Sequence, residues 1–287
     1  MKQTITITED DGVVRVDKHL ADTFPEYSRS ALAKLFTLNL IKYKGEPIQP
    51  GHKLRPGAEF QYDLGPLQET PEVIELPIIY EDDDMLVVNK PTGIISHARG
   101  RFWQEASVAS FIRDRISGMT GERGGIVHRL DRATSGVMVC AKTTDALKYL
   151  QKQFSERTVN KSYTAIIEET LDPDEAIIDA AIARNEKDPK KFRVDPLGKS
   201  AQTHYKVTKT SKKFSTVVMK PKTGRTHQLR IHMDYVGHPI VGDQLYNGAV
   251  YDRLMLHATE LSIKAPSGQM KTFRAPLPAE FNALMQE

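Results

Sequence analysis

The sequence of 287 residues contains one cysteine and one tryptophan, and it lacks any long apolar run. The single cysteine, Cys140, excludes an internal disulfide bond, and its position within the apolar run 137–141 indicates a buried, unreactive thiol. No segment approaches the roughly 20 apolar residues of a membrane-spanning helix. Residues 1–12 have no apolar signal-peptide core. We therefore expect a cytoplasmic protein that has no membrane partner.

Positive charge is modest overall but unevenly distributed. The formal net charge is +3, and 39% of the residues are hydrophobic, which is enough for a packed core. Residues 184–230, however, contain fourteen lysines and arginines and only three acids. Such a run fits either a solvated surface or a nucleic-acid interface, and charge alone does not distinguish the two.

The first part of the chain reads as a small module. Val16, Leu20 and Phe24 recur at helical spacing, and Ser28 is a suitable N-cap for a second helix. Strand-like segments follow at 40–43 and 58–63. We expect a small α/β domain over residues 1–66, a proline-containing linker over 67–77, and a larger domain over 78–287.

The larger domain is rich in short strands. Apolar runs predict strands near 85–88, 126–130, 136–142, 161–168, 201–208, 214–220 and 254–263. Helical periodicity predicts helices over 107–116 and 144–157, the second with Thr143 or Thr144 as its cap. Because strands and helices do not alternate strictly, we predict an α+β fold, with a mixed, mainly antiparallel sheet and flanking helices.

One polar loop stands between two apolar segments in residues 124–143. It places Asp131 between Arg129 and Arg132. Cationic neighbours favour the charged form of a carboxylate, and an ionised, fixed carboxylate can act as a nucleophile or a base. The same residue could instead cap the turn and form an ion pair. The spacing leaves both interpretations open.

A second cluster contains Arg225, His227, Arg230 and His232 within a few residues of a Thr-Gly turn. The planar guanidinium of arginine suits phosphate or carboxylate binding. The histidines, together with His128 and Asp131, could suggest a metal site, but the spacing matches no zinc signature. We expect no metal, and we interpret the histidines as hydrogen-bonding loop or core residues.

Aromatic residues at two further positions have an open role. Tyr163, at the start of a predicted strand, could be an ordinary core residue or could stack on an unpaired base. Phe102 and Trp103, after a basic loop, pose the same question and stay unassigned.

Six segments occur in an order that resembles the RluA-type pseudouridine synthases. They are VVNKPTGI (87–94), HRLDRATSG (128–136), KSYTA (161–165), GKSAQTHY (198–205), GRTHQLRIHM (224–233) and GHPIVGDQLY (237–246). The N-terminal module resembles the αL-type RNA-binding module of many members, except that Leu38-Asn39-Leu40 stands where a glycine often follows the second helix.

The resemblance implies an RNA pseudouridine synthase that flips a uridine out of its stack and isomerises it without a cofactor. Asp131 would be the nucleophile, Tyr163 would stack on the uracil and help to move a proton, and Arg230 would pair with Asp131. Arg129 would fill the space that the flipped base leaves. Further RNA contacts are implied for residues of both domains: Lys90, Arg132, Lys161 and Arg225, with Arg29 and Lys34 in the module.

The resemblance favours large-subunit ribosomal RNA as the target, with transfer RNA as the alternative, and a monomer. Two rival functions remain. A non-catalytic protein could clamp RNA between its domains, or a hydrolase could release free uracil. Hydrolases of glycosidic bonds usually pair two carboxylates, whereas Asp131 has arginines as neighbours.

Overall fold

The computed structural model describes residues 2–68, 73–97, 105–119 and 123–286. The chain forms two compact units. The first holds the described residues of 1–74, 97–110 and 120–123, and the second holds the remainder. Phe102 and Trp103, and part of the expected linker, lie outside the described residues. None of the helices in the described ranges is long and apolar enough to span a bilayer.

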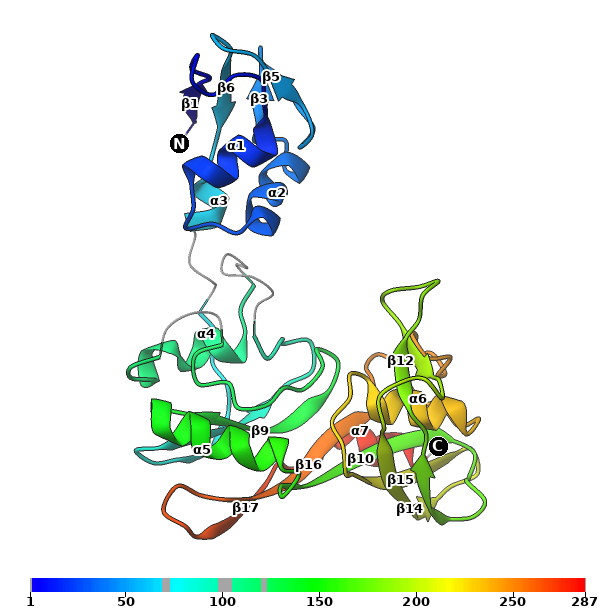
Figure 1. Cartoon of the computed structure of the whole chain (residues 1–287). Coiled ribbons are helices and arrows are strands. Elements are labelled where there is room, and N and C mark those ends of the chain that lie inside the picture. Colours follow the sequence, from blue (N-terminus) through cyan, green and yellow to red (C-terminus); the bar gives the residue numbers. More distant parts are fainter. Residues whose placement is uncertain (1, 69–72, 98–104, 120–122, 287) are drawn as a thin grey trace. The chain divides into compact units, whose positions relative to one another are not determined.

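Short helices and strands build the first unit (Figure 1). Its elements are β1 (Gln3–Thr6), β2 (Val14–Arg15), α1 (Val16–Thr23), α2 (Arg29–Thr37), β3 (Lys42–Tyr43), β4 (Glu46–Pro47), β5 (Lys53–Leu54), β6 (Glu59–Tyr62) and α3 (Gly65–Gln68). Ser28 caps α2 as predicted, since its Oγ accepts a hydrogen bond of 3.3 Å from the backbone N–H of Ala31. Leu20 of α1, Leu32 of α2 and Phe60 of β6 lie in one apolar core, where both helices pack against the strands.

A nine-stranded sheet organises the second unit. The remaining elements of the chain are β7 (Ile78–Glu81), β8 (Met85–Lys90), α4 (Val108–Ile112), the 3-10 turn Arg113–Arg115, β9 (Ser135–Ala141), α5 (Thr144–Ser155), β10 (Asn160–Glu168), β11 (Glu175–Asp179), β12 (Ile182–Arg184), β13 (Phe192–Val194), β14 (Gln202–Thr210), β15 (Phe214–Pro221), α6 (Gln228–Tyr235), β16 (Leu256–Lys264), β17 (Met270–Arg274) and α7 (Ala279–Leu284).

The strand order is β11-β14-β15-β10-β16-β9-β8-β7, with β17 also on β16. Every recorded pair within this sheet is antiparallel except β9 with β16. The predicted α+β fold with a mixed, mainly antiparallel sheet is therefore confirmed. A side chain on Gly136 would meet the backbone oxygen of Ala258 at 2.2 Å, so glycine is required where β9 meets β16.

Two apolar cores lie on different parts of this sheet. One packs α5 against β8, β9 and β16, with Leu150, Val139 and Ile263 among its buried residues. The other packs α6 and α7 against β10, β14 and β15. Thr143 caps α5 as predicted, by accepting a hydrogen bond from Ala146. The loop that carries Asp131 leads directly into β9, the strand that pairs with β16.

One predicted strand, over 126–130, is wrong. This segment makes a single bridge, between Ile126 and Cys140. Side chains satisfy its carbonyls instead: Gln151 donates to the Ile126 oxygen at 3.2 Å and Ser96 to the Leu130 oxygen at 2.7 Å. Because these side chains take the place of a neighbouring strand, the segment runs as a loop.

Candidate active site

The loop around Asp131 is fixed by the segment that follows β8. Lys90 is fully buried, and its ammonium donates to the carbonyls of Pro91, Ile94 and Arg132 at 2.9, 2.7 and 3.3 Å. Thr92 donates to the Ala133 carbonyl at 2.9 Å. Burial lowers the pKa of Lys90 to about 7, and the negative charge of Asp131 opposes that shift. Three acceptors match the three N–H groups of a charged lysine.

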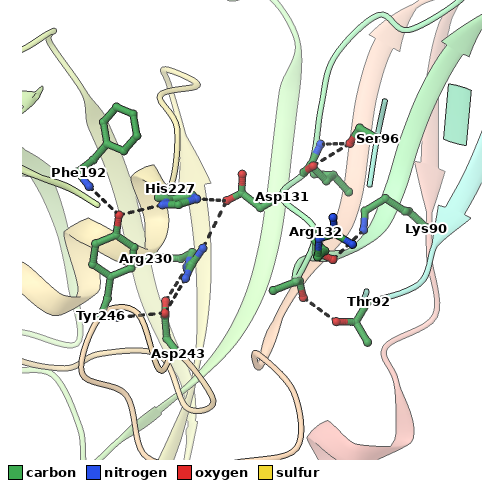
Figure 2. Close-up of polar contacts among 12 residues, drawn as sticks. Lys90, Thr92, Ser96, Asp131, Arg132, Phe192, His227, Arg230, Asp243 and Tyr246 are labelled. Atoms are coloured by element: carbon green, nitrogen blue, oxygen red, sulfur yellow. Dashed lines mark hydrogen bonds and ion pairs between the residues drawn. The ribbon is translucent and has the colours of Figure 1, made fainter. Parts of the chain in front are cut away.

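The carboxylate of Asp131 faces the opposite way, toward α6 (Figure 2). Its Oδ2 lies 3.9 Å from Nε2 of His227 and 4.0 Å from Nη1 of Arg230. The side chain is 20% exposed and lines a cavity of about 120 Å³. In the described part of the chain the carboxylate makes no recorded turn-capping hydrogen bond, so its charge is directed to the cavity.

Arg230 has its strongest contacts with Asp243. Two parallel hydrogen bonds of 2.6 and 2.7 Å join its guanidinium to that carboxylate, which is almost fully buried. Burial acts to lower the pKa of Arg230, but the hydrogen bonds and charge of Asp243 together raise it. The expected proximity of Arg230 and Asp131 is present, although Asp131 is the more distant of its two acidic partners.

His227 belongs to the same cluster and immediately precedes α6, with a left-handed backbone, φ 56°. Its Nδ1 lies 2.8 Å from the hydroxyl of Tyr246, which accepts a hydrogen bond of 3.0 Å from the Phe192 N–H. Burial raises the pKa of Tyr246, so its O–H stays available as a donor. A hydroxyl that donates to Nδ1 leaves the ring proton on Nε2, facing Asp131. Burial also lowers the pKa of His227, although the charge of Asp131 acts to raise it. The lowered pKa favours this neutral ring.

Tyr163 lies in β10, on the wall of the same cavity. The pairing of β10 with β16 shifts register between Ser162 and Tyr163, and such a bulge redirects a side chain. Burial, followed by the charge of Asp131, raises the pKa of Tyr163 well above its ordinary value. The residue therefore keeps its proton, and its ring is partly exposed rather than closed in the core.

The turn after β15 brings further cations to the cavity. Buried Gln228 accepts from the Arg225 N–H at 3.0 Å and from the Thr223 hydroxyl at 2.7 Å, which holds the turn on the sheet. Arg225, Lys161 and exposed Arg129 all line the cavity. Arg132 is exposed and donates to the Gly93 carbonyl. His232 is a core residue, bonded to Thr203 and the Ala180 carbonyl.

The two expected RNA contacts of the first unit lie on α2. Arg29 is 63% exposed and donates to Asp17 at 2.9 Å, and Lys34 is half-buried in the last turn of the helix.

A family model described as RNA pseudouridylate synthase matches residues 84–235. That range contains Asp131, Tyr163 and Arg230. The chain belongs to this family. It is an RNA pseudouridine synthase, an isomerase, and the resemblance to the RluA type is confirmed.

Relatives of this pseudouridine synthase cover most of its length. An uncharacterised RNA pseudouridine synthase of Aquifex aeolicus is 41% identical over 81% of this chain and 76% of that protein. Ribosomal large subunit pseudouridine synthase D of Borreliella burgdorferi is 33% identical over 98% of this chain and 91% of that protein. Among solved structures, human RNA pseudouridylate synthase domain containing 1 has a TM-score of 0.60 at 29% identity and covers 73% of this chain and 86% of that one.

The motifs of the pseudouridine synthase did not reveal every residue of the site. His227 was interpreted as an ordinary loop or core histidine, and Asp243, Tyr246 and Gln228 received no role. The segment GHPIVGDQLY contains Asp243 and Tyr246, so the signal was present as a motif without a chemical assignment.

Proposed function

We propose that this chain isomerises specific uridines of large-subunit ribosomal RNA to pseudouridine, with Asp131 as the nucleophile. The observation that carries the proposal is the partly exposed Asp131 carboxylate on the cavity wall, with Arg230 and neutral His227 on one side and Tyr163 on the same cavity. The relative from Borreliella burgdorferi, by its name, acts on the ribosomal large subunit.

The reaction breaks the bond between the sugar C1′ and uracil N1 and forms a bond from C1′ to C5. C5 loses its hydrogen as a proton to water, and N1 gains a proton from water. The bond that Asp131 forms breaks again, so the carboxylate is regenerated. Asp131 attacks the flipped nucleotide, and Arg230 keeps the carboxylate charged and oriented. Tyr163 presents its ring to the uracil, and its raised pKa keeps the hydroxyl protonated at neutral pH, where it can donate a hydrogen bond but not accept a proton as a base.

RNA is held by cations around this cavity. Arg129 enters the space left by the flipped base, and Arg132, Arg225 and Lys161 contact the RNA. Lys90 was expected to contact RNA, but it is fully buried, so it supports the loop that carries Asp131 instead. Residues 1–66 act as a separate RNA-binding module through Arg29 and Lys34, joined by the linker 67–77 to the catalytic domain 78–287. The protein works as a cytoplasmic monomer and needs no cofactor.

The test uses RNA transcribed with uridine labelled by tritium at C5. Pseudouridine formation releases that tritium to water, whereas hydrolysis releases free labelled uracil. We expect tritium release from a large-subunit ribosomal RNA transcript, none from transfer RNA, and no free uracil. Uracil in solution would establish hydrolysis instead, and binding without release of either product would favour the RNA clamp.

A further inference from the structure

A second cavity lies beside the one that contains Asp131. It has a volume of about 400 Å³, within the range of about 300–1,000 Å³ that is common for ligand sites. We call it the flanking pocket; it is lined by Val127, His128, Arg129, Phe154, Ser155, Arg157, Val159, Lys161, Tyr163, Lys222, Thr223, Gly224 and Arg225. Arg129, Lys161 and Arg225 line both cavities, so the two share a basic wall.

The lining of the flanking pocket contains five cationic side chains and no carboxylate. Within the described residues, no ion pair is recorded for Arg129, Arg157 or Lys222. Lys161 has one weak acceptor, the Thr223 carbonyl at 3.4 Å, and Arg225 donates through Nε to the Ser200 carbonyl. Concentrated charge of one sign without counter-charge attracts an anionic ligand.

Mutual repulsion in this cluster is visible at Lys161. Burial, followed by the charge of Arg157, lowers the pKa of Lys161 to about 8. An anion placed between these side chains would relieve both effects, because an opposite charge favours the ammonium form.

An aromatic pair forms part of the same lining. The rings of His128 and Phe154 stack with centroids 4.6 Å apart and an interplanar angle of 15°. Burial lowers the pKa of His128 to about 3, so this imidazole is neutral and adds no charge. Flat aromatic surface next to cations is the combination that holds single-stranded nucleotides, because bases stack while phosphates meet positive charge.

We propose that the flanking pocket binds the nucleotide next to the target uridine, with its phosphates on Arg157, Lys222, Lys161 and Arg225. The proposal rests on the proposed function, since the target uridine must occupy the cavity of Asp131. Two adjacent cavities with one common wall then receive two consecutive nucleotides of one strand. The target is selected partly by whether its neighbour can leave the stack and enter this pocket.

The protein side of the test uses Arg157→Ala and Lys222→Ala. Their matched controls are Arg113→Ala and Lys212→Ala, which remove the same charges from exposed positions that do not line the pocket. We expect each pocket variant to weaken RNA binding about 5- to 10-fold and to lower the slope of log K against log salt by about one, with the single-turnover rate at saturation unchanged. Controls should match the wild type.

The RNA side of the test replaces single phosphates by neutral methylphosphonates in a stem-loop substrate that carries the modified uridine. If the pocket holds the flanking nucleotide, Lys222 binds a phosphate on one side of that nucleotide. A neutral linkage at that phosphate then removes the same interaction as Lys222→Ala, so the two losses of binding free energy should not add. A neutral linkage several nucleotides away should add fully to Lys222→Ala. Full additivity at every flanking linkage would overturn the proposal.

A further experiment distinguishes failure of this proposal from failure of the proposed function. If the wild type forms no pseudouridine in any RNA, the proposed function fails. Binding of a fluorescent pentauridylate to the same variants then still tests the pocket: selective weakening in Arg157→Ala and Lys222→Ala supports it, and values equal to the controls overturn it. If pseudouridine forms but the pocket variants behave as their controls, the function stands and the pocket proposal is overturned.

Discussion

The two sides of Asp131 are built in different ways (Figure 2). On one side, Lys90, Thr92 and Ser96 donate hydrogen bonds to main-chain carbonyls. These carbonyls belong to the loop that carries Asp131 or to the segment 91–94 after β8. On the other side, His227 and Arg230 face the carboxylate itself, and Asp243 and Tyr246 hold those two side chains.

The two sets of contacts have different roles: one fixes the position of Asp131, and the other sets the reactivity of its carboxylate. Contacts to the main chain fix where Asp131 lies, and their hydrogen bonds end on carbonyls rather than on the carboxylate. Contacts to the side chain set the orientation and electrostatics of the carboxylate. Substitutions on the first side should therefore reduce stability, and substitutions on the second side should reduce the catalytic rate.

The largest effect is expected for Asp131→Asn, which removes the charge and nearly no volume. We predict a loss of about 10⁴-fold or more in single-turnover rate, because the proposed nucleophile itself is lost. RNA affinity and thermal unfolding should stay close to the wild type. A loss of rate much smaller than this would show that Asp131 is not the nucleophile.

Lys90→Met removes a fully buried ammonium and leaves three carbonyls without their donor. We predict that the free energy of unfolding falls by about 3 kcal/mol, measured by denaturant titration, while the folded fraction keeps a rate within a few-fold of wild type. Lys148→Met on the exposed face of α5 is the control and should change stability little. A large rate loss with unchanged stability would assign Lys90 to the catalytic side.

Asp243→Asn weakens the paired hydrogen bonds that orient Arg230. We predict a loss of about 100-fold in rate with RNA affinity retained, because the preorganised cation moves relative to Asp131. The pair of Arg193 and Asp195, whose residues do not line the cavity, provides the control, and Asp195→Asn should leave the rate unchanged. Equal effects of the two substitutions would show that Arg230 needs no buried partner.

Tyr246→Phe removes the hydroxyl that donates to His227, and its effect should be the smallest, about 10-fold in rate. Without this donor the neutral ring is less stabilised, so the pKa of His227 should rise from its lowered value. Protonated His227 would pair with Asp131 and block attack. The acidic limb of the pH–rate profile should therefore move to higher pH, and an unmoved limb would remove His227 from the account.

The sequence predicted the elements whose burial pattern is regular. Ser28 and Thr143 cap their helices as expected, and β8, β9, β10, β14, β15 and β16 all overlap predicted strands. The resemblance to the RluA type implied that Arg230 pairs with Asp131, and the two side chains lie 4.0 Å apart although about a hundred residues separate them in the chain.

The sequence did not indicate α6, the helix that follows His227. Residues 228–233 are all buried although Gln228, Arg230 and His232 are polar, so the apolar residues do not mark one buried helical face. The partners of this helix are also distant in sequence or chemically inconspicuous. Asp243 reaches Arg230 from a later loop, and Tyr246 links His227 to the backbone of Phe192. Spacing within one motif carries no information on such contacts.

We propose that Asp131 makes this chain a pseudouridine synthase for a defined uridine of large-subunit ribosomal RNA. The most direct measurement is pseudouridine mapping across total RNA from cells that lack the gene and are complemented with wild type or Asp131→Asn. We predict that a defined ribosomal uridine loses its modification and that only the wild type restores it. Identical maps in all strains, or restoration by Asp131→Asn, would contradict the account.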